Sequence, residues 1–513
     1  MATLDHADEK DTINSSGKHT GTESDEEQAS DVLKGTAPGD HQITADGVIH
    51  GIGDRQPTSD PADPLNWSWT KKHLVLLSIL MPALLTDFGM TWGTTLFQAQ
   101  APTFNMSVAA VANSVSGGIF LQGPGGVFAA PFAQRYGRLP VLFWSQLLSC
   151  VVVIGASQAS NYAGFTACRT IQGFVNTSPQ VIGLSIVGDM FNFRERTTRI
   201  NIWAFSFVLG PFFGPFISAF LLEKLEWRSI FGVLAGFYGF SLLILIVIGD
   251  ETLYDHNPRP SGIGGRIALL TGVAGAKATG RPTLWSGYMH TISIGLRPQV
   301  LTVTAGFLMI LFMWAIGIVT SISQFLLGPP YLFSGTAFAL FYLGPMIGAI
   351  LGEVWGHFQN EWLQNRYMRT HHGNHVPENR LYGTYIAFFF GFVGLVLFGE
   401  TLQHSLNWIG LCLGWAFVAF GMVTGTTAVS AYLLDSFTKD AAAVSSVLNF
   451  WRTMGGFCVS YFQLKWITRN GAAVTFGCQA AILGVSFLTI IATQVWGKKW
   501  RNRFPPPEVK QAF

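Results

Sequence analysis

Long apolar runs recur along this sequence, and their length restricts the fold more than any other feature. A helix needs about 20 mainly apolar residues to cross a bilayer, where only helices and closed barrels satisfy their own backbone polar groups. Of the 513 residues, 49% are hydrophobic and 12% are charged, about half the charged share of soluble domains. We therefore predict an all-α integral membrane protein with twelve transmembrane helices. The predicted spans lie near residues 73–98, 108–132, 140–159, 162–188, 199–222, 229–249, 299–322, 336–357, 382–399, 406–433, 442–464 and 472–496.

The segments between these runs divide the chain into two halves of six helices. Residues 1–62 hold nearly half of all Asp and Glu and few aromatic residues, so we predict a disordered acidic cytoplasmic tail. The N-terminal half is predicted over 63–250 and the C-terminal half over 299–497. Residues 251–298 between them are expected to form a polar cytoplasmic linker, and 498–513 a basic cytoplasmic tail.

Basic residues concentrate in every second connection between the runs. By the positive-inside bias, this pattern predicts that both termini and the linker are cytoplasmic, and the acidic N-terminus lacks the features of a cleaved signal peptide. Only the eleventh connection, with Lys465 and Arg469, disagrees. The basic residues of the even-numbered connections and the tail are Arg135, Arg138, Arg194, Arg196, Arg199, Arg259, Arg266, Lys277, Arg281, Arg297, Arg366, Arg369, Arg380, Lys498, Lys499, Arg501 and Arg503.

The two halves carry similar residues at corresponding places, which indicates a pseudo-symmetric repeat. An aspartate ends the fourth and the tenth span, an Asn-x-Trp triplet opens the fifth and the eleventh, and a Gly-Pro pair interrupts the second and the eighth. These features are Asp189 and Asp435, Asn201-Ile-Trp203 and Asn449-Phe-Trp451, and Gly123-Pro124 and Gly344-Pro345.

Three polar or glycine-rich stretches of the N-terminal half resemble known motifs. They are Ala130-Pro-Phe-Ala-Gln-Arg-Tyr-Gly-Arg-Leu139, Arg169-x-x-Gln172-Gly173, and Gly210 with Gly214-Pro215. In order, they resemble the gating, proton-transfer and antiporter motifs of the major facilitator superfamily, in particular its fungal twelve-span drug:proton antiporter branch. The resemblance covers residues 60 to 500 and implies two halves that rock around a central cavity. The chain departs from the gating motif at Gln134, where the family has an aspartate.

The gating resemblance implies a network of charges at the cytoplasmic mouth. Ion pairs there would hold the two repeats of the N-terminal half together when the pore opens outward. The alternative is that the basic residues only anchor the loops on the cytoplasmic side. The predicted gating residues are Arg135, Gly137, Arg138, Asp189, Glu195, Arg196 and Asp435.

Asp87 is the only acidic residue within the first span. A lone carboxylate in a membrane either carries a proton or pairs with a cationic substrate; the alternative is a neutral, hydrogen-bonded Asp in packing. Arg452, near the middle of the eleventh span, is the predicted counter-charge unless it pairs within its own half. For Glu353, close to the cytoplasmic end of the eighth span, we weigh an interfacial position equally with a functional one.

Arg169 lies about 10 Å below the outer surface, given the helical rise per residue. An unpaired charge at that depth is costly, so we expect Arg169 to face the cavity, with Gln172 of the same motif beside it in the coupling site. Because arginine does not release its proton, it would bias a neighbouring carboxylate or bind an anion. The alternative is a structural cap on nearby backbone carbonyls.

Several further residues receive specific predictions. Gly210, Gly214 and Pro215 allow close helix packing, and the resemblance implies that this packing also seals the empty cavity against proton leak. Asn105 opens an Asn-Met-Ser sequon in the first outer loop and is a candidate glycosylation site. The predicted cavity residues are Trp92, Tyr342, Trp415 and Asn449.

These observations predict a secondary active transporter of the plasma membrane, with a vacuolar membrane as the alternative. The leading hypothesis is proton-coupled export of a small organic molecule; the alternatives are uptake of polyamines or other organic cations, and a non-transporting nutrient sensor. No catalytic or nucleotide-binding motif is placed at a membrane face, so we expect no enzyme and no cofactor, with the proton gradient as energy source. We expect no metal site, no nucleic-acid partner, and a monomer in the lipid bilayer.

Overall fold

The computed structural model describes residues 41–43, 49–51, 58–254, 260–370, 376–437 and 440–505, without the side chains of 41–43, 49–51, Phe193, Arg194, Arg196 and Thr197. The predicted gating role of Arg196 therefore falls on a side chain outside the described part. Most of the predicted acidic tail also lies outside it. Within that tail, strand β1 (His41–Ile43) pairs antiparallel with β2 (Ile49–Gly51), with His41 opposite Gly51.

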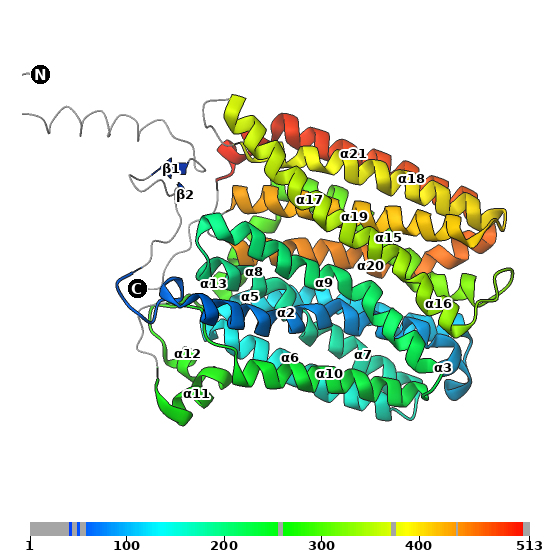
Figure 1. Ribbon diagram of the computed structural model, residues 1–513, viewed down its shortest axis with the longest axis horizontal. Helices are drawn as coiled ribbons and strands as arrows, with labels where there is room; N and C mark the ends of the chain where they lie inside the picture. Colours follow the sequence, from blue (N-terminus) through cyan, green and yellow to red (C-terminus); the bar gives the residue numbers. More distant parts are fainter. Residues whose placement is uncertain are drawn as a thin grey trace, which may run out of the picture.

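The described chain is a bundle of long helices that run along one common direction (Figure 1). The linker helices lie at one end of the bundle and the short helices α3 and α16 at the other (Figure 1); we call these the linker end and the far end. The predicted all-α membrane fold is confirmed by this architecture and by the comparisons reported below.

We group the helices by the two predicted halves, and this division stays a prediction. The N-terminal half contains η1 (Pro64–Asn66), α2 (Trp69–Thr91), η2 (Trp92–Thr95), α3 (Phe97–Phe104), α4 (Val108–Ala112), η3 (Asn113–Val115), α5 (Ser116–Tyr136), α6 (Arg138–Gln158), α7 (Tyr162–Asn176), α8 (Ser178–Met190), α9 (Phe193–Leu222) and α10 (Trp227–Val247). The C-terminal half contains α14 (Pro298–Leu301), the π-helical η4 (Thr302–Leu308), α15 (Met309–Leu326), α16 (Gly335–Phe341), α17 (Leu343–Thr370), η5 (Pro377–Tyr382), α18 (Gly383–Gln403), α19 (Trp408–Ser436), α20 (Ala441–Asn470) and α21 (Ala472–Arg503).

Nine helices of the described residues are long and apolar enough to cross a membrane, or ten if the bent pair Phe97–Phe104 and Val108–Tyr136 is one span. The count of twelve spans therefore stays a prediction. The predicted span 162–188 is divided at Thr177 into two shorter helices, since Pro179 in the first turn of α8 cannot continue the hydrogen bonding of α7. Helix α20 covers the predicted span 442–464 but carries polar and charged side chains along its length.

The linker forms helices of its own, α11 (Gly262–Thr271), α12 (Val273–Lys277) and α13 (Leu284–Gly295), which pack on both halves. Trp144 of α6 donates its indole N–H to the Thr271 carbonyl at 3.2 Å. His290 of α13 lies 2.7 Å from the Asp440 carboxylate, just before α20. The linker thus contacts α6 on one side and the start of α20 on the other.

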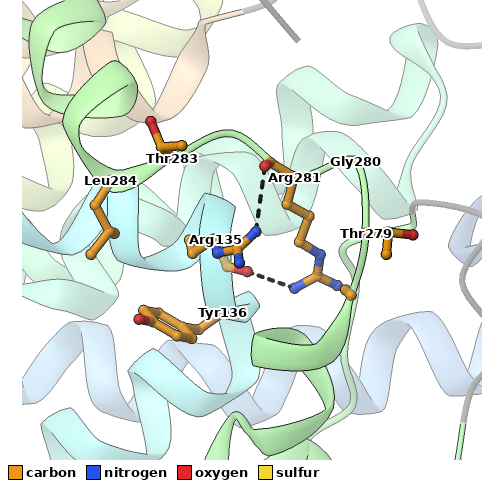
Figure 2. A pocket seen from close by; sticks show the side chains of 8 residues that line it. Arg135, Tyr136, Thr279, Gly280, Arg281, Thr283 and Leu284 are labelled. Carbon is orange, nitrogen blue, oxygen red and sulfur yellow. Dashed lines mark hydrogen bonds between the residues drawn. The ribbon is translucent and has the colours of Figure 1, made fainter. Parts of the chain in front are cut away.

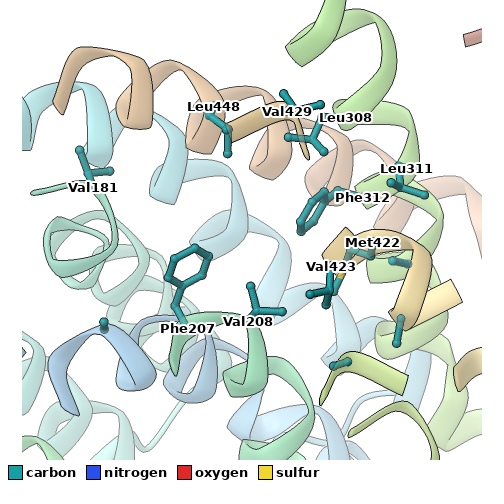
Figure 3. Close-up of a cluster of buried hydrophobic side chains, with 14 of the residues drawn as sticks. Val181, Phe207, Val208, Leu308, Leu311, Phe312, Met422, Val423, Val429 and Leu448 are labelled. Atoms are coloured by element: carbon teal, nitrogen blue, oxygen red, sulfur yellow. The ribbon is translucent and has the colours of Figure 1, made fainter. Parts of the chain in front are cut away.

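A cluster of buried apolar side chains joins the two halves in the middle of the bundle (Figure 3). Phe207 and Val208 come from α9 of the N-terminal half, whereas Phe312 comes from α15 and Met422 and Val423 from α19. Because lipid is as apolar as these side chains, close packing rather than water exclusion holds such a contact. The polar groups that interrupt this apolar interior are therefore the informative ones.

Candidate functional site

A pair of opposite charges links the two halves inside the bundle. Asp87, near the end of α2, and Arg452, on α20, approach to 3.0 Å between Oδ2 and Nη2. Their side chains are only 10% and 5% exposed, respectively. A buried charge of this kind is tolerated only with a partner and further hydrogen bonds, and both are present. Arg452 thus contacts the carboxylate of the opposite half.

Two glutamines complete the surroundings of the Asp87 carboxylate. Gln122 of α5 donates to Oδ1 at 3.1 Å, and Gln180 of α8 donates to Oδ2 at 3.1 Å. The break at Thr177 places Gln180 in the first turn of α8. The carboxylate therefore accepts N–H groups from three helices besides its own. Sequence reasoning missed both glutamines, although an amide within an apolar run is itself a signal of an interior polar contact.

Arg452 is held by more than its ion pair. Its guanidinium also donates to Asn449 Oδ1 at 3.1 Å, and it lies 5.4 Å from the Phe207 ring and 5.1 Å from the Phe312 ring, within the range of cation–π attraction. Phe207 belongs to the N-terminal half and Phe312 to the C-terminal half. This arrangement places a negative and a positive charge opposite each other across the interface between the halves.

Asn449, a predicted cavity residue, lies in this interface. Its amide donates to the Gln122 carbonyl and to Thr177 Oγ1, both at 3.1 Å. It therefore ties α20 to α5 and to the break in the fourth span while it orients Arg452. We call Asp87, Gln122, Gln180, Asn449 and Arg452 the charge centre.

Arg169 was expected to face a cavity, and that expectation is wrong. The side chain is fully buried within the N-terminal half. It donates to the Gly89 carbonyl at 2.8 Å, to Gln172 Oε1 at 2.6 Å and to the Met90 carbonyl. The last carbonyls of a helix lack intrahelical partners, and those of α2 attract the guanidinium inward. The predicted role of Arg169 and Gln172 in proton coupling stays a prediction. Arg169 is linked to the charge centre only indirectly, because it contacts α2, the helix that carries Asp87.

At the linker end, the turn between α5 and α6 contacts acidic side chains of the N-terminal half and of the start of the linker. Arg138 forms an ion pair with Asp189 and donates to the Ser185 carbonyl at 2.7 Å. The backbone N–H of Arg138 also donates to Glu251 at 3.0 Å, which caps α6. Gly137 has φ 114°, a conformation that favours glycine. Glu251 was missed by the sequence analysis, although it lies only two residues after the sixth apolar run.

Arg135 and Glu195 are two further predicted gating residues, and their gating role stays a prediction. The described hydrogen bonds of Arg135 are with the linker, where its guanidinium donates to the Arg281 carbonyl at 3.4 Å (Figure 2). Glu195 is exposed at the start of α9. The Gly137 turn directs Arg135 and Arg138 to different neighbours.

The C-terminal half has its own charge pairs at the linker end. Arg380 of η5 donates to Asp435 of α19 at 2.9 Å, and Arg501 of α21 donates twice to Glu378, at 2.9 Å each. Glu353 is buried between α17 and α19 rather than interfacial, with Thr427 Oγ1 at 3.4 Å from its carboxylate.

The predicted antiporter-motif residues lie where α9 crosses α2. A Cβ atom added at Gly214 would lie 2.5 Å from the Phe88 carbonyl oxygen, and one at Gly210 would lie 2.7 Å from the Phe88 nitrogen. Pro215 follows within α9. The glycines thus allow α9 to press against the turn of α2 that carries Asp87. Whether this contact limits proton leak stays a prediction.

The other predicted residues lie toward the far end. Trp92 donates to the Ile230 carbonyl at 3.2 Å within the N-terminal half, so its placement in a cavity is wrong; the apolar core beside α10 encloses it. Tyr342 and Trp415 pack together at 5.1 Å, and Trp415 lies 5.9 Å from Phe212 of the opposite half. Asn105 is exposed after α3, and its glycosylation stays a prediction.

Two helical halves with a polar centre at their interface form the architecture of a secondary membrane transporter. Residues 75–460 match the family model of the Major Facilitator Superfamily, and the chain belongs to this superfamily. It is therefore an integral membrane transporter and not an enzyme.

Known relatives agree with this assignment. The chain is 26% identical over 438 residues to the efflux pump radE of Floropilus chiversii, covering 81% of this chain and 78% of the pump. It is 27% identical over 415 residues to the MFS-type transporter penM of Penicillium rubens, covering 77% and 79%. Among solved structures, the E. coli proton:xylose symporter XylE matches with a TM-score of 0.59 and 12% identity over 84% of this chain and 96% of that chain. At this identity the likeness shows the fold alone.

Proposed function

We propose that this protein exports a small organic molecule across the plasma membrane in exchange for protons, with Asp87 as the group that couples the two movements. The direction is supported by relatives that include a named efflux pump. The coupling role is supported by one observation, namely the buried ion pair that Asp87 forms with Arg452 of the opposite half.

Protonation of Asp87 removes the negative charge to which Arg452 is attracted. Inside a bundle shielded from water, this attraction is far stronger than at a surface, so its loss frees the two halves to move apart on one side. Arg452 keeps Asn449 and the rings of Phe207 and Phe312 as partners. A proton on Asp87 and an ion pair with Arg452 are therefore mutually exclusive states, which is the requirement for coupled exchange.

The test is transport by the purified protein in sealed vesicles with an imposed pH gradient. The substrate panel contains neutral hydrophobic drugs and polyamines, and the variants are Asp87→Asn and the control Glu400→Gln. Glu400 is an exposed acid of α18. We expect a drug to move against protons in the wild type and the control. In Asp87→Asn, the rate of gradient-driven drug transport should fall about tenfold, which corresponds to about 1.4 kcal/mol of coupling. Equal gradient-driven transport by Asp87→Asn would refute the proposal.

Uptake of an organic cation is the second candidate, and the geometry around Arg452 favours it specifically. A guanidinium held by a carboxylate and two phenyl rings occupies a site that suits other organic cations. A polyamine would then displace Arg452 from Asp87. This candidate predicts polyamine movement that Asp87→Asn abolishes, together with indifference to neutral drugs.

A further inference from the structure

Glu353 of α17 is a buried acid whose surroundings differ from those of Asp87. It is 8% exposed and forms no ion pair with another residue that the structure describes. Its Oε2 atom lies 3.4 Å from Thr427 Oγ1 of α19, and its Oε1 atom has no hydrogen-bond partner within the described part of the chain. Asp87, by contrast, accepts N–H groups from two amides and from Arg452.

Close helix packing keeps water away from Glu353. A Cβ atom added at Gly352 would lie 2.8 Å from the Phe420 carbonyl oxygen, and one at Gly356 would lie 3.3 Å from Thr427 Cβ. An ionised carboxylate buried in a bilayer with a single distant hydroxyl as partner is strongly disfavoured. Glu353 is therefore a neutral carboxylic acid in this conformation, and it holds a proton.

Two further titratable residues follow Glu353 on the same face of α17. His357 and Glu361 come four and eight residues later, so each lies one turn beyond the last, in the direction of the linker end (Figure 1). His357 Nε2 is 3.6 Å from Glu361 Oε1, and the two side chains are 25% and 45% exposed. Exposure thus rises step by step from Glu353 to the linker end, as a path for protons requires.

The contact between the two halves interrupts this path at His357. Its Nδ1 atom contacts the side-chain amide of Asn201, which belongs to α9 of the N-terminal half. An imidazole relays a proton by accepting it at one ring nitrogen and releasing it from the other. Nδ1 is occupied while α9 and α17 touch, so the path opens only when the two helices part.

No described charge next to Glu353 offers an alternative path. Beside Glu353 and His357, α19 presents Thr424 and Thr427 and α9 presents Asn201, none of which titrates. The described charged residues on the other helices packed against α17 have other neighbours: Arg380 pairs with Asp435, Glu378 with Arg501, Glu400 with His404, Glu223 bonds to Thr336, Arg199 lies over Phe191, and Glu195 is exposed.

We propose that Glu353 is a second proton-binding site, connected to the linker end through His357 and Glu361. When α9 and α17 part, the O–H bond of Glu353 breaks and the proton passes to His357 Nδ1. The proton on Nε2 then passes to the Glu361 carboxylate and from there to water. Loading follows the same steps in reverse. Because the linker end is predicted to be cytoplasmic, protons leave on the side toward which the proposed exchange moves them.

Infrared spectroscopy of the purified full-length protein tests the site without any transport, because a protonated carboxyl group absorbs separately from a carboxylate. Spectra at neutral pH compare the wild type with Glu353→Gln and with the control Glu400→Gln, which neutralises an exposed acid of α18. Transfer into D₂O then follows the exchange of the bound proton. The variant for this step is His357→Gln, which keeps a hydrogen-bonding group for Asn201 but relays no proton, and its control is the exposed His404→Gln. Thermal unfolding curves establish that each variant is folded.

We expect Glu353→Gln to lose a protonated-carboxyl band that the wild type and both controls keep. In D₂O that band should shift, and His357→Gln should slow the shift about 100-fold, since a positioned acid–base group speeds proton transfer by about that factor or more. Identical bands in the wild type and a folded Glu353→Gln would overturn the proposal, because Glu353 would then be ionised. An equally fast shift in His357→Gln would overturn the path.

The consequence for transport rests on the proposed exchange of drug for protons. In the vesicle assay, Glu353→Gln should still exchange the drug, but the drug gradient that a given pH difference sustains should fall about tenfold per pH unit, the contribution of one coupled proton. An unchanged gradient would show that Glu353 keeps its proton throughout the cycle and would overturn its part in coupling. A wild type that exchanges no drug for protons would refute the proposed function instead, and the infrared spectra would still decide whether Glu353 binds and exchanges a proton.

Discussion

Two kinds of charge pair occur in this molecule, and they differ in what they join. The charge centre joins the N-terminal half to the C-terminal half, with side chains 10% and 5% exposed for Asp87 and Arg452. The Arg138–Asp189 and Arg380–Asp435 pairs at the linker end each stay within one half. There, Asp189 and Arg138 are 19% and 14% exposed, and Asp435 and Arg380 have nearly the same values, 18% and 13%.

Ion pairs within one half and the ion pair between the halves should have different roles in transport. The two linker-end pairs occupy similar places in the two halves. Arg138 begins α6 and Arg380 lies in η5, just before α18, and each arginine pairs with an aspartate in the last turn of another helix. They stabilise each half as a unit. Alternating access moves one half against the other, so the Asp87–Arg452 contact is the one whose partners belong to bodies that move apart.

The largest effect is expected from Arg452→Ala, which leaves the Asp87 carboxylate buried without its counter-charge. Breaking a buried pair from one side typically costs about 3–5 kcal/mol of folding free energy. The double variant Asp87→Asn/Arg452→Gln removes both charges and should recover most of that loss. Denaturant unfolding in detergent compares the two. If the double variant were as unstable as Arg452→Ala, the contact would contribute through packing rather than charge.

A smaller effect is expected from Gly214→Ala, which tests how far the charge centre depends on packing within one half. The added methyl group would clash with the Phe88 carbonyl, next to Asp87, and such overpacking costs about 1–3 kcal/mol. Gly236→Ala in α10 is the matched control, because no atom lies within 4 Å of the added carbon. Thermal unfolding should separate the two variants, and equal melting temperatures would show that α9 moves aside freely.

The sequence was sufficient for the membrane fold and for the two charged residues of the centre. Long apolar runs specify helices whatever their neighbours, and a lone charge in such a run is visible without a structure. The two glutamine partners of Asp87 were harder to predict, because Gln122 and Gln180 come from two other helices. Their meeting depends on how those helices pack, and on the break that Pro179 causes.

Arg169 and Trp92 show the opposite limit. Both lie in apolar runs, and both were expected to border a cavity. Which face of a helix meets a cavity depends on the rotation of that helix about its own axis. Arg169 is turned toward the carbonyls that end α2, and Trp92 toward α10. A sequence shows that a polar side chain in an apolar run needs a hydrogen-bond partner, but it does not show in which direction from the helix that partner lies.

The smallest effect is expected from the linker-end pairs, studied as the matched variants Asp189→Asn and Asp435→Asn. Partly exposed ion pairs contribute about 1 kcal/mol or less, and asparagine keeps one acceptor oxygen for the arginine. Each variant should therefore fold and transport at a reduced rate, with similar losses because the two pairs correspond. Transport rates in vesicles measure this directly. A loss confined to Asp189→Asn would show that the N-terminal pair has a gating part that its C-terminal counterpart lacks, and that the likeness of the two pairs is only geometric.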